Sequence, residues 1–159
     1  MEKTFELKAL KISLYGVDCK YKIAETDNDA TVTENEYRVK VSRPIHPDLE
    51  YLFTKDLTGI VAEIFDNTEY TANYKLGTPK IIPTGIAFAG MNDNIGISIS
   101  GQIDTNFGRI SFKTPRIKYK TSEKDVAAKL TVFADRVVNE AHAYLFENKT
   151  AELSVFGEE

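Results

Sequence analysis

The stretch Ile95-Gly96-Ile97-Ser98-Ile99-Ser100-Gly101-Gln102-Ile103 alternates isoleucine with small or polar residues for most of its length. Because successive side chains of a strand point to opposite faces, this alternation predicts a strand with one buried and one solvated face. Turn-forming residues lie on both sides of it, at 90–94 and at 104–106. Hairpin connections, and therefore antiparallel pairing, are expected around this strand.

Other segments show the same period of two residues. The apolar alternation of residues 5–9 shifts by one position over 10–14, which predicts a β-bulge or a bend. Gly16 separates this segment from a second alternating run at 17–23, so the two predict a hairpin. Pro83 predicts an edge position or an irregular start for a strand over 81–89. Further strands are expected over 37–41 and 70–76, and residues 110–112 and 117–119, separated by Pro115, are expected to form a last strand or strand pair.

Two segments have helical spacing instead. Apolar residues recur three and four positions apart over 47–66, and Pro47 suits the first position of a helix. Gly59 inside this helix predicts a kink or the close approach of another backbone. The cap signature of Ser122 and Asp125 begins a longer helix with one apolar face, which extends to about residue 148.

The order of these elements predicts an α+β fold rather than a doubly wound one. We expect a mainly antiparallel twisted sheet of about six to eight strands, packed against two helices of which the C-terminal one is longer. Residues 1–148 are expected to form a single domain, with 149–159 as a C-terminal tail. Strands and a helix occur on each side of about residue 67. No residue-level repeat accompanies this loose symmetry.

Composition narrows the class of protein. The chain has 159 residues, a net charge of -4 and one cysteine, Cys19, so it cannot form an internal disulfide. The N-terminal residues are interrupted by charges, and no run approaches the roughly 18 apolar residues of a membrane span. These features predict a cytoplasmic protein without a membrane segment. A strongly basic nucleic-acid binder is excluded, so any such role needs a local patch.

Catalytic signatures are weak throughout the sequence. Cys19 lies on the apolar side of a strand, where cysteine behaves as a small hydrophobic residue, and nothing local pairs it with His46 or His142. The aspartates fall in turns without the spacing of a calcium or zinc site. Phosphate-binding glycine motifs are also absent. We therefore expect a protein that is not an enzyme and has no cofactor or metal.

A basic stripe is the most informative polar feature. Residues 109–124 include six basic residues and a single acid, Glu123. The proposed nucleic-acid-binding set adds two cations from the strand at 37–41, and consists of Arg38, Lys40, Arg109, Lys113, Arg116, Lys118, Lys120 and Lys124. Lys20 and Lys22 lie on the outer side of another strand. If these strands share a sheet, their cations form one surface that could follow a phosphate backbone.

Phe107 and Tyr119 could offer stacking faces beside such a surface. The simpler interpretation is that lysines on an exposed antiparallel sheet keep its edges soluble. The opposite charge is concentrated between residues 46 and 73, where six acids accompany one base, Lys55. This acidic helix supports an alternative function, as a protein–protein inhibitor or structural assembly subunit. The polarity of the molecule could also pair copies into a homo-oligomer.

The tail contains Glu152-Leu153-Ser154-Val155-Phe156. It resembles the bacterial sliding-clamp-binding peptide, whose usual form is Gln-Leu-Ser/Asp-Leu-Phe. Leu153, Ser154 and Phe156 match, whereas Glu152 and Val155 depart from it. The resemblance implies that Leu153 and Phe156 fill a pocket on the clamp. With Val155 between them they form the expected partner-binding set, and the alternative is that Leu153, Val155 and Phe156 pack on the protein's own core. The expected function is a non-enzymatic accessory protein that contacts nucleic acid, or the proteins that process it, through the basic sheet face and this peptide.

Overall fold

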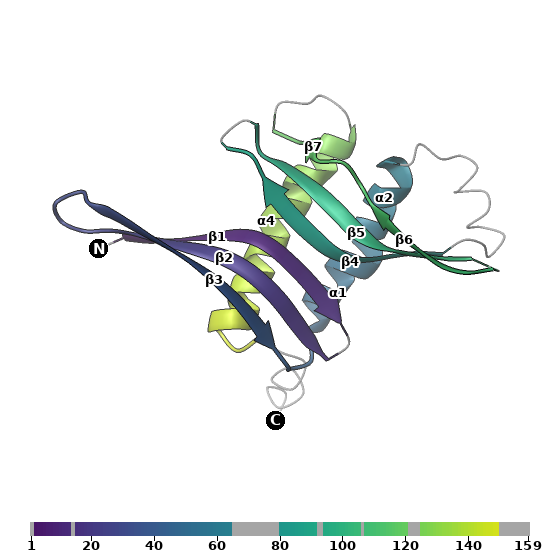
Figure 1. Ribbon diagram of the computed structural model, residues 1–159, viewed down its shortest axis with the longest axis horizontal. Coiled ribbons are helices and arrows are strands. Elements are labelled where there is room, and N and C mark those ends of the chain that lie inside the picture. The colour runs from purple at the N-terminus through teal and green to yellow at the C-terminus, as the bar shows by residue number, and fades with distance from the viewer. Residues whose placement is uncertain are drawn as a thin grey trace.

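A computed structural model describes residues 2–13, 15–64, 80–91, 94–105, 107–120 and 125–149. Within these ranges seven strands form one antiparallel sheet, in the order β3-β2-β1-β4-β5-β6, with β7 also paired to β5 (Figure 1). The strands are β1 (Glu2–Ser13), β2 (Gly16–Thr26), β3 (Val32–Val41), β4 (Lys80–Ala89), β5 (Gly96–Thr105), β6 (Gly108–Lys113) and β7 (Ile117–Lys118).

The sheet consists of two meanders that meet at β1 and β4. Those two strands pair only between Ala9–Lys11 and Gly85–Ala87, whereas pairing within each meander is long. The predicted bulge in the first strand is confirmed, since the β1–β2 register shifts between Leu7 and Ala9. This shift turns both Leu7 and Leu10 toward the core.

Of the two alternatives expected for Pro83, the edge position is wrong and the irregularity near the start of the strand is confirmed. β4 is an interior strand, because β1 and β5 flank it. Pro83 nevertheless lies outside the short segment of β4 that pairs with β1. The register between β4 and β5 shifts directly after it, between Pro83 and Gly85. A proline lacks the N–H that a second neighbour would need, so it is tolerated where only one strand pairs with it. The strand predicted over 70–76 lies outside the described residues.

Both predicted helices are present. The first runs without interruption through α1 (Pro47–Tyr51), a π-helical segment η1 (Leu52–Leu57) and α2 (Thr58–Ile64). The second is α4 (Asp125–Phe146), and its predicted cap residue Ser122 is not among the described residues. Gly59 has no other backbone close to it, so the irregularity of the first helix is the π segment before that glycine.

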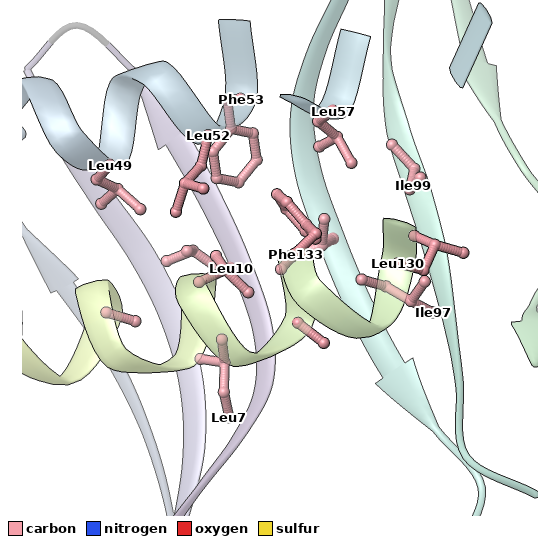
Figure 2. Close-up of a cluster of buried hydrophobic side chains, with 14 of the residues drawn as sticks. Leu7, Leu10, Leu49, Leu52, Phe53, Leu57, Ile97, Ile99, Leu130 and Phe133 are labelled. Atoms are coloured by element: carbon pink, nitrogen blue, oxygen red, sulfur yellow. The ribbon is translucent and has the colours of Figure 1, made fainter. Parts of the chain in front are cut away.

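The helices lie together on one face of the sheet and supply half of the core (Figure 1). Figure 2 shows Leu49, Leu52, Phe53 and Leu57 of the first helix facing Leu130 and Phe133 of α4 and the strand residues Leu7, Leu10, Ile97 and Ile99. Phe53 and Phe133 meet edge to face, with ring centroids 6.3 Å apart. The fold is therefore α+β, with the longer, C-terminal helix packed against the sheet.

Candidate nucleic-acid interface

The sheet face opposite the helices carries the strand residues that alternate with the buried residues of the core. In β5 the buried positions are Ile97, Ile99 and Ile103, so Ser98 and Ser100 point to the other side. Directly paired residues of antiparallel strands share a face, so the register extends this assignment across the sheet. We call this side the open face.

Most of the predicted cationic residues lie on the open face, although they come from distant parts of the sequence. It holds Arg38 and Lys40 of β3, Arg109 and Lys113 of β6, and Lys118 of β7. Arg116, just before β7, also lies across this face, because a Cβ atom added at Gly96 would come within 2.7 Å of its Cγ atom. Lys120 is exposed beyond the end of β7, and Lys124 lies outside the described residues.

The open face also contains Lys11, which the sequence-based set omits. Lys11 is paired with Asp18 of β2 and Gly85 of β4, near the centre of the sheet. The signal for it was present in the sequence: once the bulge turns Leu10 inward, its neighbour Lys11 must point outward. Lys20 of β2, paired with Arg38, lies on the same face as expected.

Several cations of the open face are paired with acids of the same face. Lys22 lies 3.3 Å from Glu6 and 3.4 Å from Glu34. Arg38 lies 3.2 Å from Asp18, and its hydrogen bond is the main reason that the pKa of the Asp18 carboxyl is lowered. Such exposed pairs contribute little to stability, but they reduce the charge available to a ligand.

On the open face, six exposed cations of β1–β3, β6, β7 and the residue before β7 have no ion pair with any described acid. Arg109 is not one of them, because it lies 3.8 Å from Asp104. Lys118 hydrogen-bonds to the uncharged Asn94 side chain at 3.3 Å. The six are Lys11, Lys20, Lys40, Lys113, Arg116 and Lys118. We call them the unpaired cations, and they form two groups, on β1–β3 and on β6–β7.

Small residues separate these two groups. The centre of the open face is formed by Ala9, Gly85, Ala87, Ser98 and Ser100 of β1, β4 and β5. Gly85 leaves space for the Lys11 stem, since a Cβ atom there would lie 3.1 Å from Lys11 Cγ. The result is a low floor between the two cationic groups, which the Lys11 stem covers at Gly85 and on which an extended ligand could approach the rest of the backbone closely.

A shallow hollow of about 340 Å³ lies at the β1–β2 turn, next to the first group of cations. Lys11 and Lys40 line it together with Tyr15, whose side chain is 78% exposed. An exposed ring in a hollow that two cations also line is suited to stacking on a base, and the sequence-based set did not include Tyr15. Phe107 is fully exposed in the β5–β6 turn, whereas Tyr119 is buried and so cannot act as a stacking residue.

The described residues do not form a catalytic arrangement around Cys19. This thiol is fully buried, and burial, with a smaller effect of the nearby Asp18 charge, raises its pKa to about 12. His46 accepts a hydrogen bond from the backbone N–H of Asp48 at the start of α1, and His142 packs against Phe5. Among these same residues no three His, Cys, Asp or Glu side chains are placed to hold a metal ion.

The acids of the first helix are largely engaged within the protein. Asp56 lies 3.6 Å from Arg136 of α4, and Glu63 is paired with Lys129 of the same helix. Asp48 lies 2.8 Å from Lys149. The hydrogen bond from the Lys149 ammonium is the main cause of the lowered pKa of the Asp48 carboxyl. The acidic helix face is therefore partly neutralised by α4 and by the residues that follow it.

The tail residues Leu153, Val155 and Phe156 lie outside the described residues, so their role stays a prediction. None of the helices in the described ranges combines the length and apolar character needed to cross a membrane. The chain matches no protein-family model, and neither the curated proteins nor the solved structures contain a significant match to it.

Proposed function

We propose that this protein binds nucleic acid through the open face, as a non-enzymatic accessory protein. The observation that carries the proposal is convergence: the unpaired cations come from residues 11 to 118, yet they share the one sheet face that the helices leave uncovered. The net charge of the chain is -4, so this concentration is local and does not follow from overall composition.

The proposed mode of binding is contact with the phosphate backbone. The small residues between the two cationic groups let a strand of nucleic acid lie close to the sheet, and the cations on each border replace its counterions. Because the floor itself has no aromatic or bidentate base-reading side chain, binding should depend little on sequence. Tyr15 in the hollow could add the stacking of one base.

The tail extends this proposal to a protein partner. If Leu153, Val155 and Phe156 bind as the peptide they resemble, they would recruit the protein to a bacterial sliding clamp while the open face contacts nucleic acid. The alternative function, inhibition or assembly through the acidic helix, has weaker support, because Asp56 and Glu63 are already paired with α4.

The proposal is tested by measuring the affinity for single-stranded and duplex DNA at about 50 mM and about 200 mM salt. The test variant combines Lys20→Ala, Lys113→Ala and Arg116→Ala. The control combines Lys55→Ala, Lys129→Ala and Arg136→Ala on the helix side, which removes the same number of positive charges. We expect the test variant to weaken binding about 10- to 100-fold at the lower salt concentration and the control to have little effect.

Two results would contradict the proposal. One is the lack of binding by the unmodified protein to either form of DNA at the lower salt concentration. The other is an equal loss of affinity in the two triple variants, since it would mean that net charge rather than the open face determines binding. Retained circular dichroism in both variants would exclude unfolding as the cause of a loss.

A further inference from the structure

β3 is an edge strand that is unusually open to solvent. It occupies one end of the sheet order, and no described strand pairs with its outer side. Its residues from Val32 to Arg38 are all exposed. A long free edge presents unpaired N–H and C=O groups, so it is a ready template for another strand. Its charges determine which strand would fit.

The turn before β3 shows which backbone groups point to the free edge. The Asp27 N–H donates to the Thr31 carbonyl (3.1 Å), and the Ala30 N–H donates to the Asp27 carbonyl (3.1 Å), with Ala30 at a φ of 61°. The backbone groups of Asp27 and Thr31 therefore point toward each other, as in a hydrogen-bonded pair, and the β2–β3 register continues from them without a shift. Because hydrogen-bonded and non-hydrogen-bonded pairs alternate, the even-numbered residues of β3 direct their N–H and C=O groups outward.

The side chains of these even-numbered residues carry charges in an order that is complementary to a second, antiparallel copy of the same strand. Along Glu34-Asn35-Glu36-Tyr37-Arg38-Val39-Lys40 the acids and bases are arranged symmetrically about Tyr37. We propose that two copies of this protein pair through their β3 edges in an antiparallel manner, with Tyr37 on the two-fold axis. Glu36 then lies opposite Arg38 of the second copy, and Glu34 lies opposite its Lys40.

The charges select this register over its neighbours. Opposite charges in directly opposed positions stabilise a strand pair, and like charges destabilise it. With the axis at Glu36 or at Arg38, that residue would oppose its own copy and bring like charges together. With the axis at Tyr37, all four charged residues of the edge meet opposite charges. The same axis pairs even-numbered residues with each other, as their outward N–H and C=O groups require.

Aromatic side chains near the axis supply apolar surface for the interface. Tyr37 is 44% exposed and stacks on Tyr21, with ring centroids 5.2 Å apart. Tyr21 in turn contacts Phe146 at the end of α4, and Phe146 is 50% exposed. A two-fold axis at Tyr37 brings the Tyr37 rings of the two copies together on the helix side of the sheet. This burial adds a hydrophobic contribution to the strand pairing.

Pairing would join two sheets into one and place two open faces side by side. It would also engage Arg38 and Lys40 in ion pairs with the second copy. The cations left for a phosphate backbone would then be Lys11, Lys20, Lys113, Arg116 and Lys118 of each copy. The dimer proposal does not rest on nucleic-acid binding, because its evidence is the edge, the charges and the aromatic residues of β3.

A charge exchange tests the register directly. The dissociation constant of the dimer is measured by sedimentation equilibrium, without nucleic acid, for the unmodified protein, Glu36→Arg, and Glu36→Arg combined with Arg38→Glu. The single variant sets like charges opposite each other at two symmetry-related positions, so we expect it to raise the dissociation constant about tenfold or more. The double variant restores opposite charges and should recover most of the lost affinity. Glu50→Arg on α1 is the matched control, with no expected effect.

Cysteine trapping tests the axis independently of charge. At a two-fold axis Tyr37→Cys opposes itself across a non-hydrogen-bonded pair, where Cα atoms lie about 4.5 Å apart and a disulfide can form. Asn35→Cys, on the same side of the strand, would be separated from its copy by about 13 Å along the strands. Mild oxidation should therefore crosslink Tyr37→Cys but not Asn35→Cys, while the buried Cys19 stays unreactive. An unmodified protein that is monomeric at every concentration, a double variant no tighter than Glu36→Arg, or equal crosslinking of the two cysteine variants would overturn the proposal.

Discussion

Thr114 is the buried polar side chain at the bend between β6 and β7. Its Oγ1 atom accepts a hydrogen bond from the Ile99 N–H (2.9 Å) and donates one to the Pro115 carbonyl (3.0 Å). Its own N–H donates to the Ile99 carbonyl at 2.8 Å. Thr114 thus satisfies the backbone groups of Ile99 in β5 at the point where neither β6 nor β7 pairs with that strand. These bonds fix the bend between the two strands, with Lys113 before it and Arg116 after it.

We expect Thr114→Val to lower the free energy of unfolding by about 1–3 kcal/mol, because a side chain of the same shape would leave the Ile99 N–H buried without a partner. Urea denaturation followed by circular dichroism measures this effect. Thr4→Val, the same change at an exposed position of β1, should alter stability by less than about 0.5 kcal/mol. Equal stability of Thr114→Val and the unmodified protein would show that the side-chain hydrogen bond is dispensable.

At the scale of elements, the first helix shows how local irregularity and packing coexist. Its central segment is π-helical, and the Thr58 hydroxyl donates to the Phe53 carbonyl at 3.3 Å, five residues earlier. The wider turn still points Leu52, Phe53 and Leu57 into the core. Gly59 follows this segment at an exposed position, and a Cβ atom there would have no neighbouring atom within 4 Å.

Gly59→Ala is therefore expected to raise the free energy of unfolding by about 0.5–1 kcal/mol, because alanine loses less backbone entropy than glycine when the helix forms. The midpoint of urea denaturation should shift upward without a change in slope. Gly16→Ala provides the contrast, since its Cβ atom would lie 2.1 Å from the Val41 carbonyl oxygen and should be strongly destabilising. A loss of stability in Gly59→Ala would mean that the helix needs glycine there for a reason other than space.

At the scale of the whole molecule, the open face depends on the junction of the two meanders. The β1–β4 pairing places Lys11 and Lys20 on the same surface as Lys113 and Arg116. If one backbone of nucleic acid crosses both groups, each group should contribute separately to the dependence of affinity on salt.

We expect Lys11→Ala with Lys20→Ala to reduce the slope of log affinity against log salt concentration by about 1.5, and Lys113→Ala with Arg116→Ala to reduce it by a similar amount. The four substitutions together should reduce it by about 3. Titrations of labelled single-stranded DNA at several salt concentrations measure these slopes. A slope that responds to only one of the two pairs would restrict the interface to one meander.

Local pattern was sufficient to predict the fold class and most of the elements, although the strand expected over 37–41 already begins at Val32. The strand expected over 70–76 lies outside the described residues and stays a prediction. The two-residue period of 95–103 predicted β5, the one-residue slip before Leu10 predicted the bulge of β1, and the helical spacing of 126–144 predicted α4. These signals are reliable because neighbouring residues in a strand or helix have fixed relative directions. The same alternation also separated Lys20, Lys22, Arg38 and Lys40 from the core side of their strands.

Local sequence pattern therefore identified most of the strands, both helices and, within each predicted strand, the side chains that point away from the core. The pairing of β1 with β4, the burial of Tyr119 and the presence of Lys11 on one surface with the cations of β6 and β7 became visible only in the folded molecule. The reason is physical: side-chain direction within an element is set by local backbone geometry, whereas the order and register of strands depend on contacts between residues far apart in the chain.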